Sequence, residues 1–173
     1  MNRKINTIII GLGRIGIGYD EHTPNVTLTH YKAIQKHKNF KLIGCIEVNK
    51  INRDKFIKKY KVPCYENLSK IKNKINPELA IIASPTNTHY RIIKEILKNH
   101  KTISSILCEK PFGNKYQDAN KILKICKKNK VKVFVNYMRT ADPGAIKILK
   151  IIRGKLNNNY KGTVFYDGNT LNQ

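Results

Sequence analysis

A hexapeptide with three glycines, Gly11-Leu-Gly13-Arg-Ile-Gly16, directly follows a short isoleucine-rich run at residues 5–10. An apolar run of this length is typical of a buried strand. In the G-x-G-x-x-G pattern after such a strand, Gly11 bends the chain, Gly13 lets the backbone approach a pyrophosphate and Gly16 lets a helix pack against the strand. Because the backbone N–H groups of this turn can hold phosphate, the pattern predicts a dinucleotide site. The alternative is a glycine-rich turn that binds no ligand.

Strand-like and helix-like segments alternate along the chain after this turn. Further apolar runs, bounded by Gly, Pro or Asn, lie at residues 40–47, 79–83, 104–108 and 131–135. Between them, apolar residues recur with the helical period at 92–97, after a Thr88 or Asn87 cap, and at 119–126. This alternation predicts an α/β fold, a doubly wound parallel sheet of the Rossmann kind with helices on both faces.

The pattern changes after residue 135. Residues 136–144 are predicted to form a loop, and a helix is predicted over 145–153. A polar connection at 154–161 and one strand at 163–166 follow. Since a single strand is a poor place for a domain to end, we expect this part to be the beginning of a further domain.

The chain of 173 residues carries a formal charge of +23, which raises the hypothesis of a nucleic-acid-binding protein. Its 28 lysines outnumber its 6 arginines, and Lys, Ile and Asn together make 74 residues. All three have codons rich in A and T, so we attribute most of the charge to base composition. A nucleic-acid surface would favour arginine and gather its charge in one stripe, whereas these lysines lie in every helical segment. We therefore expect weak, salt-sensitive binding to polyanions and no specific nucleic-acid partner.

The apolar runs and the cysteines bear on the compartment of the protein. No run approaches the ~20 apolar residues that span a bilayer, and the N-terminal run is too short for a signal peptide. The cysteines, Cys45, Cys64, Cys108 and Cys126, have neither metal-ligand nor redox spacing and are predicted to be buried, reduced thiols. We expect a cytoplasmic protein with no metal site and no membrane partner.

Glu47, at the end of the second predicted strand, is the candidate for ribose recognition. An acidic residue at this place accepts hydrogen bonds from ribose hydroxyls in dinucleotide-binding folds. Glu47 comes 31 residues after Gly16, where about 20 is usual, and an inserted polar segment at 19–29 accounts for the excess. A carboxylate here repels the 2′-phosphate of NADP and favours NAD, although Lys50 and Arg53 lie nearby. The alternative is a solvated charge at a strand end.

Two further loops follow predicted strands, Ser84-Pro85-Thr86-Asn-Thr-His89 and Cys108-Glu109-Lys110-Pro111. The carboxyl ends of parallel strands face the ligand crevice, so both loops are expected there. His89 is either a ligand contact or a capped surface histidine. Lys110 is held in an extended conformation by the following proline. Its ammonium group can hydrogen-bond a substrate hydroxyl and stabilise negative charge as a proton leaves, which makes it the candidate catalytic residue.

With these motifs in this order, the chain resembles the Gfo/Idh/MocA family, the group of glucose–fructose oxidoreductase and inositol dehydrogenase. The resemblance covers residues 5–170, and its most specific motif is Glu-Lys-Pro after a buried strand. It implies a Rossmann domain at 1–137 that binds NAD(P) and the start of an α+β substrate domain at 138–173. Since members are about twice this length, it implies that the family's acid/base Asp and His have no counterpart here. Homo-oligomers are expected only for a full-length form.

The resemblance also implies roles for individual residues. Lys110 matches the family's catalytic lysine, Arg139 matches the arginine after the last Rossmann strand, and the Lys110–Pro111 bond is a candidate for cis geometry. Pro85, His89, Glu109 and Asn136 are expected near the nicotinamide end. The expected contacts of the cofactor are Gly11, Gly13, Arg14, Ile15, Gly16, Glu47, Ser84, Pro85, Thr86, His89, Glu109, Lys110 and Asn136.

The motifs and the resemblance together indicate an NAD(P)-dependent oxidoreductase, with NAD expected over NADP. Hydride would pass between the nicotinamide and a hydroxyl or ketone carbon of a sugar, nucleotide sugar or cyclitol. The 19–29 segment and the 160–169 tail look most like members that act on nucleotide sugars or other sugars in polysaccharide synthesis. This chain would supply the nucleotide-binding part and turn over poorly or not at all by itself. The alternative is a non-catalytic dinucleotide-binding module, either a sensor or the remnant of a split gene.

Overall fold

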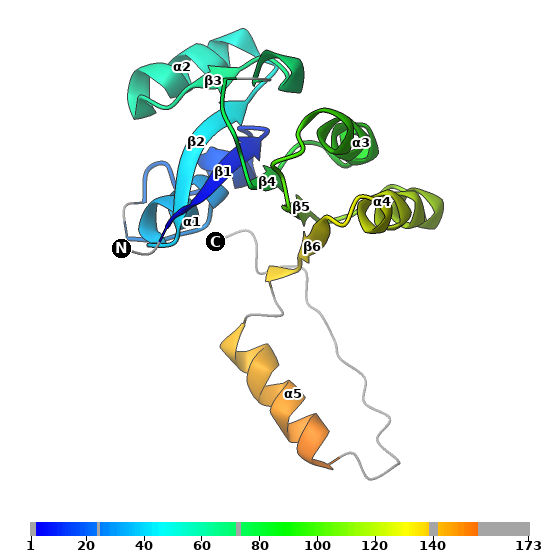
Figure 1. Ribbon diagram of the computed structural model, residues 1–173. Coiled ribbons are helices and arrows are strands. Elements are labelled where there is room, and N and C mark those ends of the chain that lie inside the picture. The colour runs from blue at the N-terminus through cyan, green and yellow to red at the C-terminus, as the bar shows by residue number, and fades with distance from the viewer. Residues whose placement is uncertain (1–2, 24, 72–73, 139–141, 156–173) are drawn as a thin grey trace. The chain divides into compact units, whose positions relative to one another are not determined.

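The computed structural model describes residues 3–23, 25–71, 74–138 and 142–155 of the chain (Figure 1). They belong to two units, Met1–Asn136 and Tyr137–Gln173. Arg139 and the predicted strand at 163–166 lie outside the described residues.

The second unit contains one described helix, α5 (Pro143–Lys155). Its existence agrees with the helix predicted over 145–153. It extends through residues 154 and 155, which we predicted to belong to a polar connection. Gly154 was expected to open that connection, but a glycine near the end of a helix costs only about 0.5–1 kcal/mol relative to alanine and does not stop the helix here.

The first unit is built on a parallel sheet of six strands in the order β3-β2-β1-β4-β5-β6. The chain runs outward from β1 in one direction, returns, and then runs outward in the other. This confirms the predicted α/β, doubly wound Rossmann fold. The strands are β1 (Ile5–Ile10), β2 (Phe40–Ile46), β3 (Cys64–Tyr65), β4 (Leu79–Ile82), β5 (Ser105–Glu109) and β6 (Lys132–Asn136).

Four helices connect the strands and cover both faces of the sheet (Figure 1). One face packs against α1 (His30–Lys36) and α2 (Lys50–Tyr60), and the other against α3 (His89–Asn99) and α4 (Tyr116–Lys128). Three short helical turns precede longer elements or join them: η1 (Arg14–Gly18), η2 (Leu68–Ile71) and η3 (Thr86–Thr88).

Alternate residues of the central strand enter two separate cores. Ile8 and Ile10 pack with α3 and α4, in a core that includes Ile93, while Ile9 packs with α1 and α2, in a core that includes Phe56. All five are at most 3% exposed. A side chain of this size contributes about 1.5–3 kcal/mol when fully buried. Burial on both faces explains why the strand is a continuous apolar run and not an alternating one.

The structure corrects three expectations about elements. β3 was not predicted, because two residues are too few to show a period. The glycine turn leads into the single wide turn η1, of π type, before α1 begins at residue 30. Thr88 does precede α3, but its hydroxyl bonds Ser84 Oγ at 2.7 Å and the Pro85 carbonyl at 2.6 Å, and so does not cap the helix.

The four cysteines are free thiols, as predicted, although Cys64 is only half-buried. Burial raises the pKa of Cys64 and of Cys108 to about 12, so both stay protonated at neutral pH. None of the helices in the described ranges combines the length and the apolar character needed to cross a membrane.

Candidate functional site

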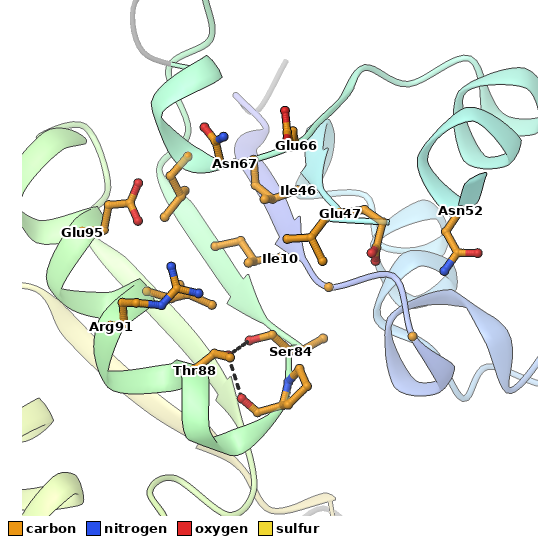
Figure 2. Close-up of a pocket in the computed structure, with 17 residues that line it drawn as sticks. Ile10, Ile46, Glu47, Asn52, Glu66, Asn67, Ser84, Thr88, Arg91 and Glu95 are labelled. Carbon is orange, nitrogen blue, oxygen red and sulfur yellow. Dashed lines mark hydrogen bonds between the residues drawn. The ribbon is translucent and has the colours of Figure 1, made fainter. Parts of the chain in front are cut away.

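A cavity of about 630 Å³ opens at the carboxyl ends of β1, β2 and β4, where the strand order reverses. This edge is the usual ligand crevice of an open α/β sheet. Figure 2 shows Ile10 and Ile46 in the middle of the cavity, with Glu47 on one side and Arg91 and Glu95 of α3 on the other. The lining residues are Ile10, Gly11, Gly13, Ile46, Glu47, Val48, Asn52, Glu66, Asn67, Leu68, Ala83, Ser84, Pro85, Thr88, Arg91, Ile92 and Glu95.

The three glycines of the turn meet different surroundings. Gly11 has a φ of +97°, and a Cβ there would lie 2.8 Å from the carbonyl oxygen of Ala83. A Cβ on Gly16 would overlap the carbonyl oxygen of Gly11. A Cβ on Gly13, by contrast, would meet no atom within 4 Å, although Gly13 lines the cavity. The turn thus leaves open space against the Gly13 backbone, which fits the close approach of a pyrophosphate.

Two other residues of this turn, Arg14 and Ile15, were also expected to contact the cofactor. Arg14 is exposed, and its guanidinium lies 5.9 Å from the centre of the Tyr19 ring. Ile15 is half-buried. Neither residue lines the cavity.

Glu47 holds the glycine turn and the end of β2 together. Its Oε2 accepts a hydrogen bond from the backbone N–H of Leu12 at 2.9 Å, and its Oε1 accepts one from the N–H of Asn49, also at 2.9 Å. Each carboxylate oxygen keeps a further lone pair. The half-buried carboxylate therefore shapes the cavity and can still accept hydrogen bonds from a ligand.

The two cations nearest to Glu47 are both engaged. Arg53 donates from Nη1 to the carbonyl oxygens of Glu47, at 2.7 Å, and of Val48, at 3.1 Å. Lys50 pairs with Asp54 at 2.7 Å, one helical turn further along α2. Neither side chain lines the cavity, whereas Glu47 does.

A second polar cluster lies at the carboxyl ends of β5 and β6. Glu109 Oε1 is 2.7 Å from Nε2 of His30 and accepts a hydrogen bond from the side chain of Asn136 at 2.6 Å. Burial by itself raises the pKa of Glu109. The hydrogen bonds from His30, Asn136 and the backbone N–H of Lys110 outweigh it and lower that pKa below 4.5, so the carboxylate is ionised at neutral pH.

Lys110 follows Glu109 directly, and its side chain is exposed. The Lys110–Pro111 peptide bond is cis, as the resemblance implied. The residues on either side of this dipeptide, Glu109 and Phe112, are both buried. The segment therefore presents one flexible cationic side chain from an anchored stretch of backbone.

His89 lies inside the protein, only 1% exposed, and is not a surface residue. Its Nε2 is 2.9 Å from the carbonyl oxygen of Ser84, while its Nδ1 lies 3.3 Å from the Cys108 thiol and 3.4 Å from the carbonyl oxygen of Phe112. A ring that donates from Nε2 to Ser84 leaves Nδ1 to accept the thiol proton, and the Phe112 carbonyl oxygen, itself an acceptor, then lies near Nδ1 without a hydrogen bond. His89 thereby connects the loops that follow β4 and β5.

The structure divides the expected contact residues into two groups. Gly11, Gly13, Glu47, Ser84 and Pro85 line the cavity. The remaining ones, Arg14, Ile15, Gly16, Thr86, His89, Glu109, Lys110 and Asn136, do not line it.

Sequence reasoning missed several polar lining residues, among them Asn52, Glu66, Asn67, Arg91 and Glu95. Arg91 and Glu95 are spaced i, i+4 on α3, on the same polar side of the helix as the exposed Lys94 and Lys98, so the pattern alone could not distinguish them from a solvated face. Asn67 follows β3 and could be placed only once that strand was known. Within the ranges the structure describes, no three His, Cys, Asp or Glu residues are grouped to hold a metal ion.

Comparison with known proteins agrees with this geometry. The model of the Gfo/Idh/MocA oxidoreductases, described as an NAD-binding Rossmann fold, matches residues 5–137. The chain belongs to the Gfo/Idh/MocA family. The matched stretch contains the glycine turn, Glu47 and the Glu-Lys-Pro motif.

Similar proteins include a curated relative and solved structures from several organisms. Glucose-6-phosphate 3-dehydrogenase of Bacillus subtilis is 28% identical over 109 residues, which are 63% of this chain and 28% of that protein. The structure of the WlbA dehydrogenase of Bordetella pertussis with NADH and UDP-GlcNAcA matches with a TM-score of 0.75 and 20% identity, over 88% of this chain and 42% of that one.

A third match is the scyllo-inositol dehydrogenase of Lactobacillus casei with NAD(H) and scyllo-inositol. Its TM-score is 0.70 and its identity 21%, over 88% of this chain and 41% of that one. At such identities the structural matches establish the fold. The chain spans less than half the length of each of these relatives.

Proposed function

We propose that this chain forms the cofactor-binding part of an NAD-dependent oxidoreductase that acts on a CH–OH group of a sugar, nucleotide sugar or cyclitol. The observation that carries the proposal is the placement of the glycine turn and Glu47 in one cavity at the point where the strand order reverses. In this fold a dinucleotide lies across that point, with one nucleotide on each side.

The two polar clusters suit the two halves of such a ligand. Gly13 leaves room for the pyrophosphate, and Glu47 is placed to accept hydrogen bonds from the adenosine ribose. The other half then extends over β4, β5 and β6, where Pro85, Glu109 and Lys110 lie. The residues present therefore fit NAD. When bound, its nicotinamide ring supplies the acceptor or donor of hydride.

The charges around Glu47 favour NAD over NADP. A 2′-phosphate on the adenosine ribose would approach a carboxylate, while Arg53 is bound to backbone carbonyls and Lys50 to Asp54. The cavity as a whole is lined by three glutamates against a single arginine, Arg91. An additional dianionic group at this place would be repelled.

Lys110 is proposed to act on the substrate. Its exposed ammonium group, on an anchored backbone, can hydrogen-bond the reacting hydroxyl and stabilise the charge that develops as the proton leaves. The substrate class follows from the relatives, whose names refer to glucose 6-phosphate, UDP-GlcNAcA and scyllo-inositol.

Titration with both reduced cofactors tests the nucleotide site. We expect NADH to bind at least tenfold more tightly than NADPH, a difference of about 1.4 kcal/mol. Glu47→Gln removes the charge, keeps an acceptor oxygen and should narrow that preference. Glu78→Gln is the control, because Glu78 precedes β4 at the opposite edge of the sheet. Equal affinities for the two cofactors in the wild type would contradict the NAD preference.

Turnover tests the enzymatic part of the proposal. Because this chain by itself is expected to turn over poorly or not at all, the assay uses a full-length form that carries a complete substrate domain. With NAD+ and a panel of sugars, sugar phosphates, nucleotide sugars and cyclitols, we expect that form to produce NADH, followed at 340 nm, with at least one of them. Lys110→Met should lower that rate by at least 10²-fold and leave NADH binding unchanged. Lys115→Met, a change of the same kind at an exposed lysine before α4, is the control. Binding of NADH without turnover of any compound would instead support the non-catalytic dinucleotide-binding module.

A further inference from the structure

Three side chains from distant parts of the chain meet where β5 and β6 end. His30 opens α1, Glu109 ends β5 and Asn136 ends β6. His30 and Glu109 are each 8% exposed, and their closest atoms are 2.7 Å apart. Ion pairs on protein surfaces form and break in water, whereas this contact is buried and shared with a third group. It is therefore a fixed part of the fold at the edge where the nicotinamide half is proposed to bind.

The buried carboxylate depends on its donors. An ionised group at this depth is costly unless hydrogen bonds replace its hydration. Asn136 and the backbone N–H of Lys110 come from the same sheet edge as Glu109 itself. His30 is the one of these three donors that comes from another layer of the molecule, the helix α1. Without the His30 donor, the Glu109 side chain would be free to turn toward water. Its carboxylate would then lose the hydrogen bond from the backbone N–H of Lys110.

The inserted segment at 19–29 explains why His30 is available at this position. The carboxylate of Asp20, 4% exposed, accepts hydrogen bonds from the backbone N–H groups of Leu28 (2.6 Å) and Thr29 (2.9 Å) and from the Thr29 hydroxyl (2.7 Å). Thr29 in turn caps α1 by accepting from the N–H of Lys32. The first residue of the helix, His30, is thereby held with its ring toward Glu109.

We propose that His30 is a positioning residue for the nicotinamide end of the site: through Glu109 it fixes the end of β5, over which the nicotinamide half is proposed to lie and from which Lys110 projects. The inference rests on the proposed function and extends it from the sheet edge to α1 and the 19–29 segment. His30 does not line the cavity around Glu47 and the glycine turn, so its effect belongs to the nicotinamide half of the ligand alone.

The test compares two ligands that differ only at that half. NADH and ADP-ribose share the adenosine and the pyrophosphate, but ADP-ribose has no nicotinamide ring. The full chain is titrated with both, as wild type, His30→Phe and His30→Gln. Phe keeps an aromatic ring but has no donor, while the amide of Gln can take the place of the Nε2–H group. Since the protein has no tryptophan, the emission of bound NADH can be read directly.

We expect His30→Phe to weaken NADH at least tenfold relative to wild type, to abolish the change in NADH emission on binding, and to leave the affinity for ADP-ribose within twofold. His30→Gln should restore most of the NADH affinity. His22→Gln, the same change at an exposed histidine of the 19–29 segment, should leave the affinities for both ligands unchanged.

Other outcomes contradict the inference in distinguishable ways. If His30→Phe weakens both ligands equally, or neither, His30 has no particular role at the nicotinamide end. If His30→Gln weakens NADH binding as much as His30→Phe does, the loss of the hydrogen bond to Glu109 is not the cause of the weaker binding. If the wild type binds ADP-ribose and NADH with equal affinity, the nicotinamide half contributes nothing to binding. That result would contradict the inference about His30 but would still support the nucleotide site. If the wild type binds neither ligand, the proposed function itself fails.

Discussion

Within the turn after β1, one added methyl group would have a different consequence at each glycine. Gly11 has a positive φ and touches the strand-end backbone of β4, and Gly16 touches Gly11. Both are needed for the chain to fold as it does. Gly13 has a φ of −70°, which any residue adopts, and open space beside it. We therefore attribute the use of glycine at this position to the proposed pyrophosphate and not to the fold.

Alanine substitutions should therefore separate folding from binding. Gly11→Ala should lower the free energy of unfolding by about 1–3 kcal/mol, since it combines backbone strain with a clash against Ala83. Gly13→Ala should fold at least as stably as the wild type, with a gain of up to about 1 kcal/mol, because it restricts the unfolded chain. It should nevertheless weaken NADH at least tenfold.

Urea unfolding and NADH titration of the same samples make this comparison. A Gly13→Ala protein that binds NADH like the wild type would show that the backbone at Gly13 is not approached by the pyrophosphate. A Gly11→Ala protein of unchanged stability would contradict the strain assigned to that φ.

At the scale of elements, the segment at 19–29 replaces the continuous helix that usually follows a glycine turn. η1 makes a single wide turn, and the chain then loops out before α1 begins. Asp20 closes this loop, Lys59 of α2 pairs with Glu21 at 2.7 Å, and the loop is thus anchored at both helices of this face. These contacts make the residues at both ends of the segment a structural part of the fold.

Asp20 makes the stability of this segment depend on pH. Burial alone raises the pKa of Asp20, but the hydrogen bonds from Leu28 and Thr29, with the charge of Lys32, lower it below its ordinary value of 3.8. A carboxyl group with a depressed pKa in the folded state stabilises the protein above its unfolded pKa, and this contribution is lost as the pH falls through the folded pKa. Asp20→Asn lacks this contribution at every pH.

The free energy of unfolding, measured by urea at several pH values from 6 to 3, should show the difference. Wild type should be the more stable protein at pH 6, and its advantage over Asp20→Asn should shrink as the pH drops below about 4. Glu21, Glu78 and Glu109 also have lowered pKa values, but both proteins keep them. A constant difference between the two proteins over this range would contradict the role of Asp20.

The whole molecule carries a net charge of +23, but the lining of the cavity is mostly acidic. The lysines lie on the solvated sides of the helices, whereas the cavity contains Glu47, Glu66 and Glu95 with Arg91. A ligand that binds there is selected by this local, mostly acidic lining and by the glycine turn. The net charge governs non-specific association with polyanions, which salt suppresses.

The elements that the sequence predicted best are those with a long, regular pattern. The bounds of β1 were predicted correctly, and α3, α4 and α5 were located within a few residues, because apolar periodicity and burial are directly linked. β3 and η1 escaped prediction because each is too short to have a period of its own. β3 exists because it pairs with β2, where Cys64 lies beside Cys45.

The sequence by itself determined the fold class, the glycine turn, the acidic residue after β2 and the Glu-Lys-Pro segment, since each depends on residues close together in the chain. Only the tertiary structure decided which of these share a cavity, that His89 is buried between two loops, and that His30 reaches Glu109. The physical reason is that such contacts join positions up to 79 residues apart. They form only when parallel strands bring their carboxyl ends to one edge, a consequence of the whole sheet and not of any local pattern.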